Sequence, residues 1–168
     1  VDNASGDGSA EMVAEEFPSV RLVVNEKNTG FSHGNNLGIA ESTGEFVALL
    51  NPDTEIKPGA FEGLISFIRA TPDCSVVGPK IFFGDGSEQF SFRSFPGFTA
   101  SLFNRDSLLT KLFPRNRFSQ TYLMSAADRD STHSVDWLSG SCMVVRRKAM
   151  EQVGLLDEDF FMYAEDVD

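Results

Sequence analysis

The sequence predicts an α/β fold in which a mostly parallel sheet is flanked by helices. Strand-like and helix-like segments alternate along the first half of the chain. The segment at 45–50 is almost continuously apolar, as strands buried on both faces of a parallel sheet are. With 168 residues, 41% of them apolar, the chain suits a single domain, spanning 1–168, with a sizeable core.

The order of the elements follows from residue periodicity and turn signals. Val1 to Asn3 reads as a strand end, further strands are expected at 20–24, 45–50 and 74–77, and helices are expected at 10–17, 35–42 and from Pro58 to Thr71. In the last of these helices, Phe61, Leu64, Ile65 and Ile68 recur at the spacing of one helical face. The pattern weakens between 81 and 134. Strand-like sequence returns at 135–145, and a short helix at 147–153 ends at Gly154.

Polar loops follow three of the strand ends. Because ligands of open α/β sheets bind beyond the carboxyl ends of the strands, Asp2, Asn28 and Asp53 are expected on one rim. The formal net charge of -11 argues against a nucleic-acid partner, which needs a basic surface. If the ligand of this acidic chain is a nucleoside diphosphate, which is also anionic, a divalent cation held by carboxylates would offset the repulsion. The alternative is a solvated acidic surface that keeps the protein soluble.

Cys74 and Cys142 lie beside apolar segments and suit buried free thiols of a reduced, cytoplasmic protein better than a disulfide or zinc site. His33 and His133 lack metal-ligand spacing. The stretch 101–118 mixes Leu and Phe with Arg and Lys. It fits either a helix lying on a membrane surface or, as we favour, a helix packed on the sheet.

Two acidic motifs are candidates for chemistry. Asp53 lies in Asn-Pro-Asp-Thr after the most apolar strand, where a carboxylate can bind Mg²⁺ or Mn²⁺ together with substrate phosphates; the alternative is a plain turn. Glu165 and Asp166 follow an aromatic run, which suits general-base work; the alternative is a helix N-terminus that favours acids. A Gly/Asn-rich stretch at 25–38 would let backbone approach a ligand.

The order of the motifs is more specific than any one of them. They read Val-Asp-Asn-Ala-Ser at 1–5, Asn-Thr-Gly-Phe at 28–31, Gly-Asn-Asn-x-Gly at 34–38, Leu-Asn-Pro-Asp at 50–53, Trp-Leu-Ser-Gly-Ser-Cys at 137–142 and Phe-Phe-Met-Tyr-x-Glu-Asp-Val-Asp at 160–168. This series resembles the family 2 glycosyltransferases of the GT-A fold, especially their rhamnosyltransferase-like branch. The resemblance covers nearly the whole chain; only about 82–133 lacks a matching motif.

The resemblance implies a role for each matched position. Asp166 would be the catalytic base, with Glu165 helping to position it or the acceptor, and Asp53 would bind the metal. Asn51 stands where the family has the first acid of its DxD-type motif. Asp2 would contact the base or ribose of the nucleotide, with Asn28, Gly30 and Asn36 near it, and Trp137, Gly140 and Ser141 would line the donor and acceptor region.

The implied activity is an inverting transfer from a dTDP- or UDP-sugar to a saccharide or lipid-linked acceptor. Such an enzyme would serve cell-surface polysaccharide or glycolipid synthesis, in the cytoplasm or peripherally at the inner face of the membrane. The family's first strand and helix, and a helix after the last motif, are missing, so we expect a chain truncated at both ends, which could lack activity by itself. The alternatives are a non-catalytic nucleotide-sugar-binding module and a nucleotidyltransferase.

Overall fold

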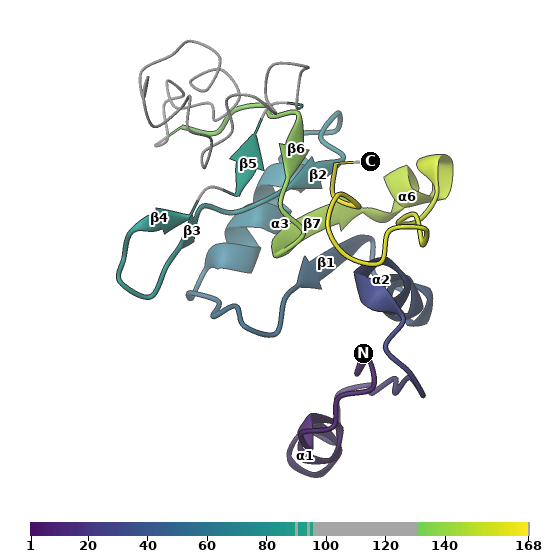
Figure 1. The fold of residues 1–168 in the computed structure, drawn as a ribbon. Coiled ribbons are helices and arrows are strands. Elements are labelled where there is room, and N and C mark those ends of the chain that lie inside the picture. Colours follow the sequence, from purple (N-terminus) through teal and green to yellow (C-terminus); the bar gives the residue numbers. More distant parts are fainter. Residues whose placement is uncertain (90, 94, 96–130, 168) are drawn as a thin grey trace, which may run out of the picture.

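A computed structural model describes residues 1–89, 91–93, 95 and 131–167 (Figure 1). The helices are α1 (Ser9–Glu16), α2 (Gly30–Glu41), α3 (Ala60–Ala70) and α6 (Arg147–Val153), and the strands are β1 (Phe46–Leu50), β2 (Val76–Val77), β3 (Ile81–Phe82), β4 (Glu88–Gln89), β5 (Phe92–Arg93), β6 (Trp137–Leu138) and β7 (Cys142–Arg146). The alternative assignments for 101–118 lie outside the described residues. Within the described helices, none is long and apolar enough to cross a membrane.

The main sheet has the order β1-β7-β2, and β7 pairs antiparallel with both neighbours. The α/β class is as expected, but the pairing in this sheet is antiparallel where a mostly parallel one was predicted. The chain inserts β7, where Cys142 to Val145 are all buried, between β1 and β2 in the opposite direction to both. Such a strand takes the centre of the sheet. It separates β1 from β2, which run parallel to each other without pairing.

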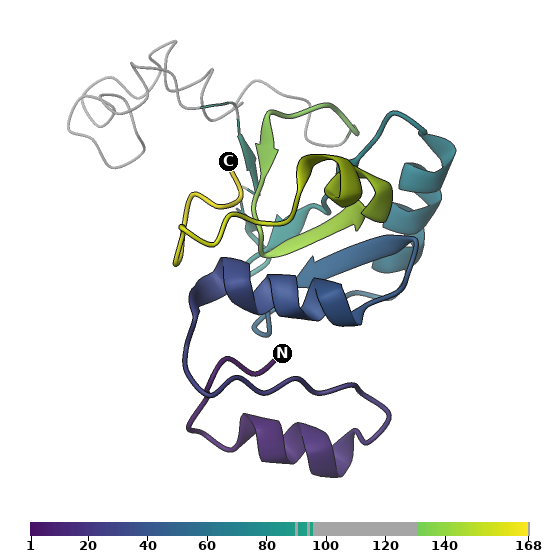
Figure 2. The ribbon, with the colours of Figure 1, turned by 90° about the vertical axis from the view of Figure 1, so that its right-hand side faces the viewer.

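The two faces of this sheet are covered by different helices (Figure 2). On one face, Ile39 of α2 packs with Val47, Leu49, Met143 and Val145, and Met150 of α6 and Leu156 pack against this cluster. Alternate residues of a strand face opposite sides. Val144 therefore faces the other side, and both Val144 and Ile68 of α3 are fully buried.

The N-terminal segment stands apart from this core. The predicted strand at 20–24 is reduced to a parallel bridge between Asp2 and Val24, supported by hydrogen bonds from Asp2 N–H to Val23 O (2.8 Å) and from Asn25 N–H to Asp2 O (2.9 Å). Every residue of α1 is at least partly exposed, and the helix lies away from the sheet in both views. Large apolar side chains are exposed here, namely Val1, Met12, Phe17, Val20 and Val24.

The bounds of α2 and α6 can be compared with the predicted helices. Helix α2 begins at Gly30, earlier than predicted, because Asn28 Oδ1 accepts a hydrogen bond from Gly30 N–H (3.0 Å) at its start. Helix α6 has the predicted bounds and ends at Gly154, whose φ is 104°. A short hairpin, β3-β4, and a two-stranded antiparallel pair, β5-β6, complete the described fold.

Candidate active site

The Asn51–Asp53 turn leaves the end of β1 beside the loop that enters β7. Asn51 N–H donates to Ser141 O (2.9 Å), extending the β1–β7 pairing by one step, and Thr54 N–H donates to Asn51 O (3.2 Å) to close the turn. The pairing therefore places Asn51 next to Ser141. Asp53 is exposed at the tip of this turn.

The Ser139–Ser141 loop also contacts the C-terminal acidic motif. Gly140 N–H donates to Asp166 Oδ2 (3.2 Å). Gly140 is buried, and a Cβ on it would lie 3.0 Å from Phe31 Cζ and 4.0 Å from Asp166 Cβ. The loop belongs to one predicted motif and contacts two others. Ser141 O accepts the Asn51 N–H, and Gly140 N–H donates to Asp166.

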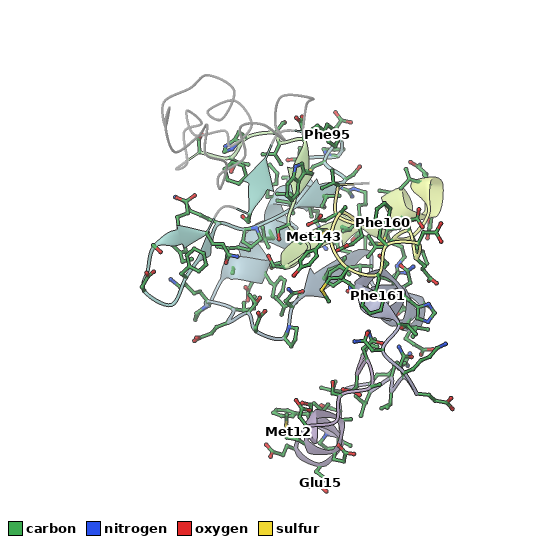
Figure 3. The ribbon with its side chains drawn as sticks, viewed as in Figure 1. Met12, Glu15, Phe95, Met143, Phe160 and Phe161 are labelled. Carbon is green, nitrogen blue, oxygen red and sulfur yellow. The ribbon has the colours of Figure 1, made fainter. Side chains whose placement is uncertain are left out.

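A third set of contacts joins the start of α2 to the C-terminal segment. Phe31 N–H donates to Phe161 O (2.8 Å). Gly30 has a φ of +87°, and a Cβ there would lie only 2.4 Å from Phe161 O. Figure 3 shows Phe161 beside the start of α2. Gly30, which sequence reasoning placed near a nucleotide, therefore also allows the C-terminal segment to approach α2 closely.

The acidic motif follows a strained turn. Tyr163 and Ala164 have φ values of 69° and 77°, in the left-handed region that non-glycine residues rarely adopt. Val167 N–H donates to Ala164 O (3.1 Å) and closes the turn around Glu165 and Asp166. Strained backbone of this kind persists only where surrounding contacts hold it, and it occurs often at functional sites.

Glu165, Asp166 and Trp137 line one wide cavity of about 1250 Å³. Its wall is largely apolar and includes Leu138, Met143 and Val145. Glu165 Oε2 is buried and has no hydrogen-bond partner within the described residues. An oxygen in this state is able to accept a hydrogen bond from a ligand in the cavity.

The loop after the first bridge is organised by Asn3. Its Oδ1 accepts hydrogen bonds from Asn25 Nδ2 (2.9 Å), Thr29 N–H (3.2 Å) and Thr29 Oγ1 (3.1 Å). Its Nδ2 donates to Asn28 Oδ1 and to Gly30 O, both at 3.0 Å. Asn3 belongs to the Val-Asp-Asn-Ala-Ser motif, and no role was predicted for it. An Asn between a strand end and a Gly/Asn-rich loop is the signal that was available.

Asp2 and Asn36 are both buried and both contact the chain itself. Asp2 is 8% exposed, and its Oδ2 accepts from Ser5 N–H (3.1 Å). Asn36 is 7% exposed; its Nδ2 donates to Leu156 O (2.8 Å) and Glu158 Oε1 (2.9 Å), and its Oδ1 accepts from Leu156 N–H (3.1 Å). The amide of Asn36 is engaged with the C-terminal segment, and its predicted place near a nucleotide stays a prediction.

Glu158 and Cys142 have pKa values that their surroundings shift. Hydrogen bonds from Asn36 and then from His33 lower the pKa of Glu158. Burial raises the pKa of the Cys142 thiol. Both cysteines are free. Cys142 is buried as predicted, whereas Cys74 is partly exposed, so the prediction of a buried thiol is wrong at Cys74.

The predicted metal would have few protein ligands. In the described part of the chain, no group of three or more His, Cys, Asp and Glu side chains is arranged to hold an ion. Asp53 offers an exposed carboxylate and Asn51 an amide oxygen nearby in the same turn. Such hard oxygen donors suit Mg²⁺ or Mn²⁺, provided that a ligand diphosphate and water complete the coordination.

Comparison with known proteins defines the class. The family model described as Glycosyl transferase family 2 matches residues 1–154. The fold and the loops at its edge are therefore those of a glycosyltransferase domain. The chain belongs to glycosyl transferase family 2, which confirms the resemblance read from the motifs.

Several curated relatives are similar over much of the chain. An N-acetylglucosaminyl-diphospho-decaprenol L-rhamnosyltransferase of Mycobacterium tuberculosis is 35% identical over 99% of this chain and 57% of its own length. A low-salt glycan biosynthesis hexosyltransferase of Haloferax volcanii is 28% identical over 100% and 50%. A rhamnosyltransferase of Escherichia coli is 26% identical over 83% and 52%. The chain thus spans about half the length of these relatives, and no solved structure matches it.

Proposed function

We propose that the protein transfers a sugar from a nucleoside-diphosphate sugar to an acceptor hydroxyl, inverting the anomeric centre in one displacement. The observation that carries this proposal is the Ser139–Ser141 loop. Asp166, the candidate base, is bonded to Gly140 of this loop, and Asn51 of the turn that carries Asp53 is bonded to the next residue, Ser141. Family membership and the named transferases among the relatives support the reaction class.

Asp166 acts as the general base. Its Oδ2 accepts the Gly140 N–H, which orients the carboxylate and leaves Oδ1 to receive the proton of the acceptor hydroxyl. The acceptor oxygen attacks the anomeric carbon as the bond to the diphosphate breaks, and the proton passes to Asp166. General-base assistance contributes roughly 10²–10⁴-fold in typical enzymes.

Asp53, with Asn51 beside it, would hold a Mg²⁺ or Mn²⁺ ion when a nucleoside diphosphate is bound. A divalent ion there supplies charge stabilisation to the departing nucleoside diphosphate. The exposure of Asp53 leaves its carboxylate open to such an ion. Because the chain carries a net charge of -11, the cation also offsets the repulsion of an anionic donor.

The nucleotide lies along the loops at Asp2, Asn28 and Gly30. The Asn3 network fixes these loops before the ligand arrives, which reduces the ordering cost of binding. A dTDP- or UDP-sugar is the donor that the resemblance implies. The rhamnosyltransferase names of two relatives make dTDP-rhamnose the first donor to test.

The acceptor enters the cavity beside Asp166. Glu165 Oε2, which has no partner within the described residues, accepts a hydrogen bond from an acceptor hydroxyl, and Trp137, which also lines the cavity, flanks the reacting sugar. Ser141, bonded to Asn51, lies on the side of the Asp53 turn. A saccharide on a lipid diphosphate is the acceptor class that we favour, since one relative is named for a decaprenol-linked substrate. Such an acceptor places the enzyme at the cytoplasmic face of the membrane, in the synthesis of a cell-surface glycan.

A donor screen on the full-length protein tests this proposal. With dTDP- and UDP-sugars, Mn²⁺ and an acceptor, we expect release of nucleoside diphosphate. Asp166→Asn should lower turnover by about 10²–10⁴-fold and keep donor affinity, whereas Glu151→Gln, on the exposed surface of α6, should leave both unchanged. Release of pyrophosphate would indicate a nucleotidyltransferase. Donor binding without any turnover would indicate a non-catalytic module.

A further inference from the structure

The segment at 156–161, which leads to the acidic motif, forms hydrogen bonds with α2 at three of its residues. Leu156 exchanges hydrogen bonds with the Asn36 side chain, Glu158 bonds to both Asn36 and His33, and Phe161 O accepts the Phe31 N–H. On α2, His33 and Asn36 are three residues apart and lie on one face of the helix, and Phe31 adds its backbone N–H in the first turn. One face of α2 and its first turn therefore hold the segment that leads to the site.

Glu158 is the centre of this attachment. Asn36 Nδ2 lies 2.9 Å from its Oε1, and His33 Nδ1 lies 2.7 Å from its Oε2. Both carboxylate oxygens are thus held by α2, although half of the side chain's surface is exposed. The hydrogen bonds from Asn36 and His33 favour the charged form of Glu158 and so lower its pKa. We call His33, Asn36 and Glu158 the latch.

Asp166 is connected to α2 from two sides. From the N-terminal side, the latch and the Phe31–Phe161 hydrogen bond hold the chain up to the strained turn at Tyr163 and Ala164. From the other side, Gly140, which donates to Asp166, leaves the space beside it to the Phe31 ring, since a Cβ on Gly140 would lie 3.0 Å from Phe31 Cζ. A shift of the segment along α2 would therefore move the carboxylate relative to Gly140.

We propose that His33, Asn36 and Glu158 are positioning residues for Asp166, and that they set the place of the base through the 156–161 segment without touching substrate. This inference rests on the proposed function, because it assumes that Asp166 is the base. It also gives the buried Asn36 amide a role other than nucleotide contact. Displacing a reacting group by about 1 Å can reduce turnover about 10²-fold, so loss of the latch should act on kcat.

Substitution of Glu158 tests the latch, because a half-exposed side chain can be changed without opening the core. Glu158→Ala removes both attachments. Glu158→Gln keeps an oxygen for Asn36 and an amide donor for the His33 ring nitrogen. Asp159→Ala removes a neighbouring exposed carboxylate that makes no described bond to α2 and is the matched control.

In the full-length protein we expect Glu158→Ala to lower kcat about 10- to 100-fold while the KM for the donor stays within about twofold. Glu158→Gln should recover most of the lost kcat, and Asp159→Ala should match the wild-type protein. A fall in kcat for Glu158→Ala that Gln does not recover, an equal effect in Asp159→Ala, or unchanged kcat in Glu158→Ala would each overturn the proposal.

Amide hydrogen exchange separates this proposal from the function on which it rests. Peptides covering 156–167 and 28–33 should exchange faster in Glu158→Ala than in the wild-type protein or Asp159→Ala, while peptides covering β1 and β7 stay protected. Unchanged exchange in 156–167 would overturn the latch even where transfer is observed. An inactive wild-type protein would overturn the function, and the exchange rates would still decide whether the latch holds the segment.

Discussion

Gly30 is where α2 and the C-terminal segment come closest. Its φ of +87° suits glycine, and the space for a Cβ is occupied by Phe161 O at 2.4 Å. Any side chain here must push the 156–161 segment away from α2. The same residue thus combines a backbone conformation and a close approach that only glycine satisfies.

Gly30→Ala is therefore expected to destabilise the fold. The left-handed conformation alone costs about 1–3 kcal/mol in a non-glycine residue, and the contact with Phe161 adds to it. Gly63→Ala is the control, since Gly63 lies inside α3 with open space around it; it should stabilise by about 0.5–1 kcal/mol. Urea unfolding measures both, and equal shifts in the two variants would contradict the close approach at Gly30.

Single residues were predicted best where a motif is contiguous. Asp166, Gly140 and Asn51 were each chosen from sequence, and the structure brings them to one loop. Asn3 and Glu158 received no role, because their significance lies in partners 22 to 27 and 122 to 125 positions away. No local pattern shows such contacts. Whether each chosen residue has its predicted role stays a prediction.

At the scale of elements, Arg146 joins β7 to the end of α3. Its Nη2 donates to Ile68 O (2.6 Å) and Thr71 O (3.4 Å), its Nε donates to Cys74 O (3.3 Å), and its Cζ lies 5.3 Å from the centre of the Phe46 ring. A cation at the carbonyl end of a helix also interacts favourably with the helix dipole. One planar guanidinium thus links three elements.

Arg146→Lys should destabilise the protein by about 1–3 kcal/mol, because an ammonium cannot make these hydrogen bonds together and a group left unpaired is costly. Arg69→Lys is the matched control. Arg69 also lies over Phe46, at 5.6 Å, but it is 64% exposed and pairs with Glu45 at 3.5 Å, so its loss should cost under about 0.5 kcal/mol. Thermal unfolding compares them, and a comparable loss in both would rule out this role for Arg146.

Element bounds were predicted well where periodicity is strong and poorly where composition is mixed. The apolar run of β1 and the stripe of α3 predicted both elements. The start of α2 was missed because Gly, Ser and Asn are poor helix formers, and the helix depends there on Asn28 and on Phe161. Tertiary contacts, which a propensity does not contain, set that boundary.

For the whole molecule, the order of strands was the least predictable feature. Alternating strand and helix signals favoured parallel neighbours, but β7, which comes late in the chain, lies between β1 and β2. The sequence marks β7 as apolar without saying where it inserts. The placement matters for function, because the loop entering β7 is the one that brings Asn51 and Asp166 together.

The net charge of -11 sets a condition on any anionic donor. If Asp53 holds the cation, nucleoside diphosphate should bind much more tightly with Mn²⁺ than without it. Asp53→Ala should remove this gain, a loss of about 1.5–3 kcal/mol, as for hydrogen bonds to charged groups, or roughly 10- to 100-fold in Kd. Isothermal titration calorimetry on the full-length protein measures the difference.

Glu55→Ala provides the comparison for Asp53→Ala, because Glu55 is an exposed carboxylate two positions further along the same loop. A general effect of acidic charge would change the Mn²⁺-dependent gain similarly in both variants, since long-range repulsion depends little on which of two neighbouring carboxylates is removed. Direct ligation would act through Asp53 alone. If Mn²⁺ still increases the affinity for nucleoside diphosphate in Asp53→Ala, Asp53 is not a ligand of the metal, and other groups must bind the cation.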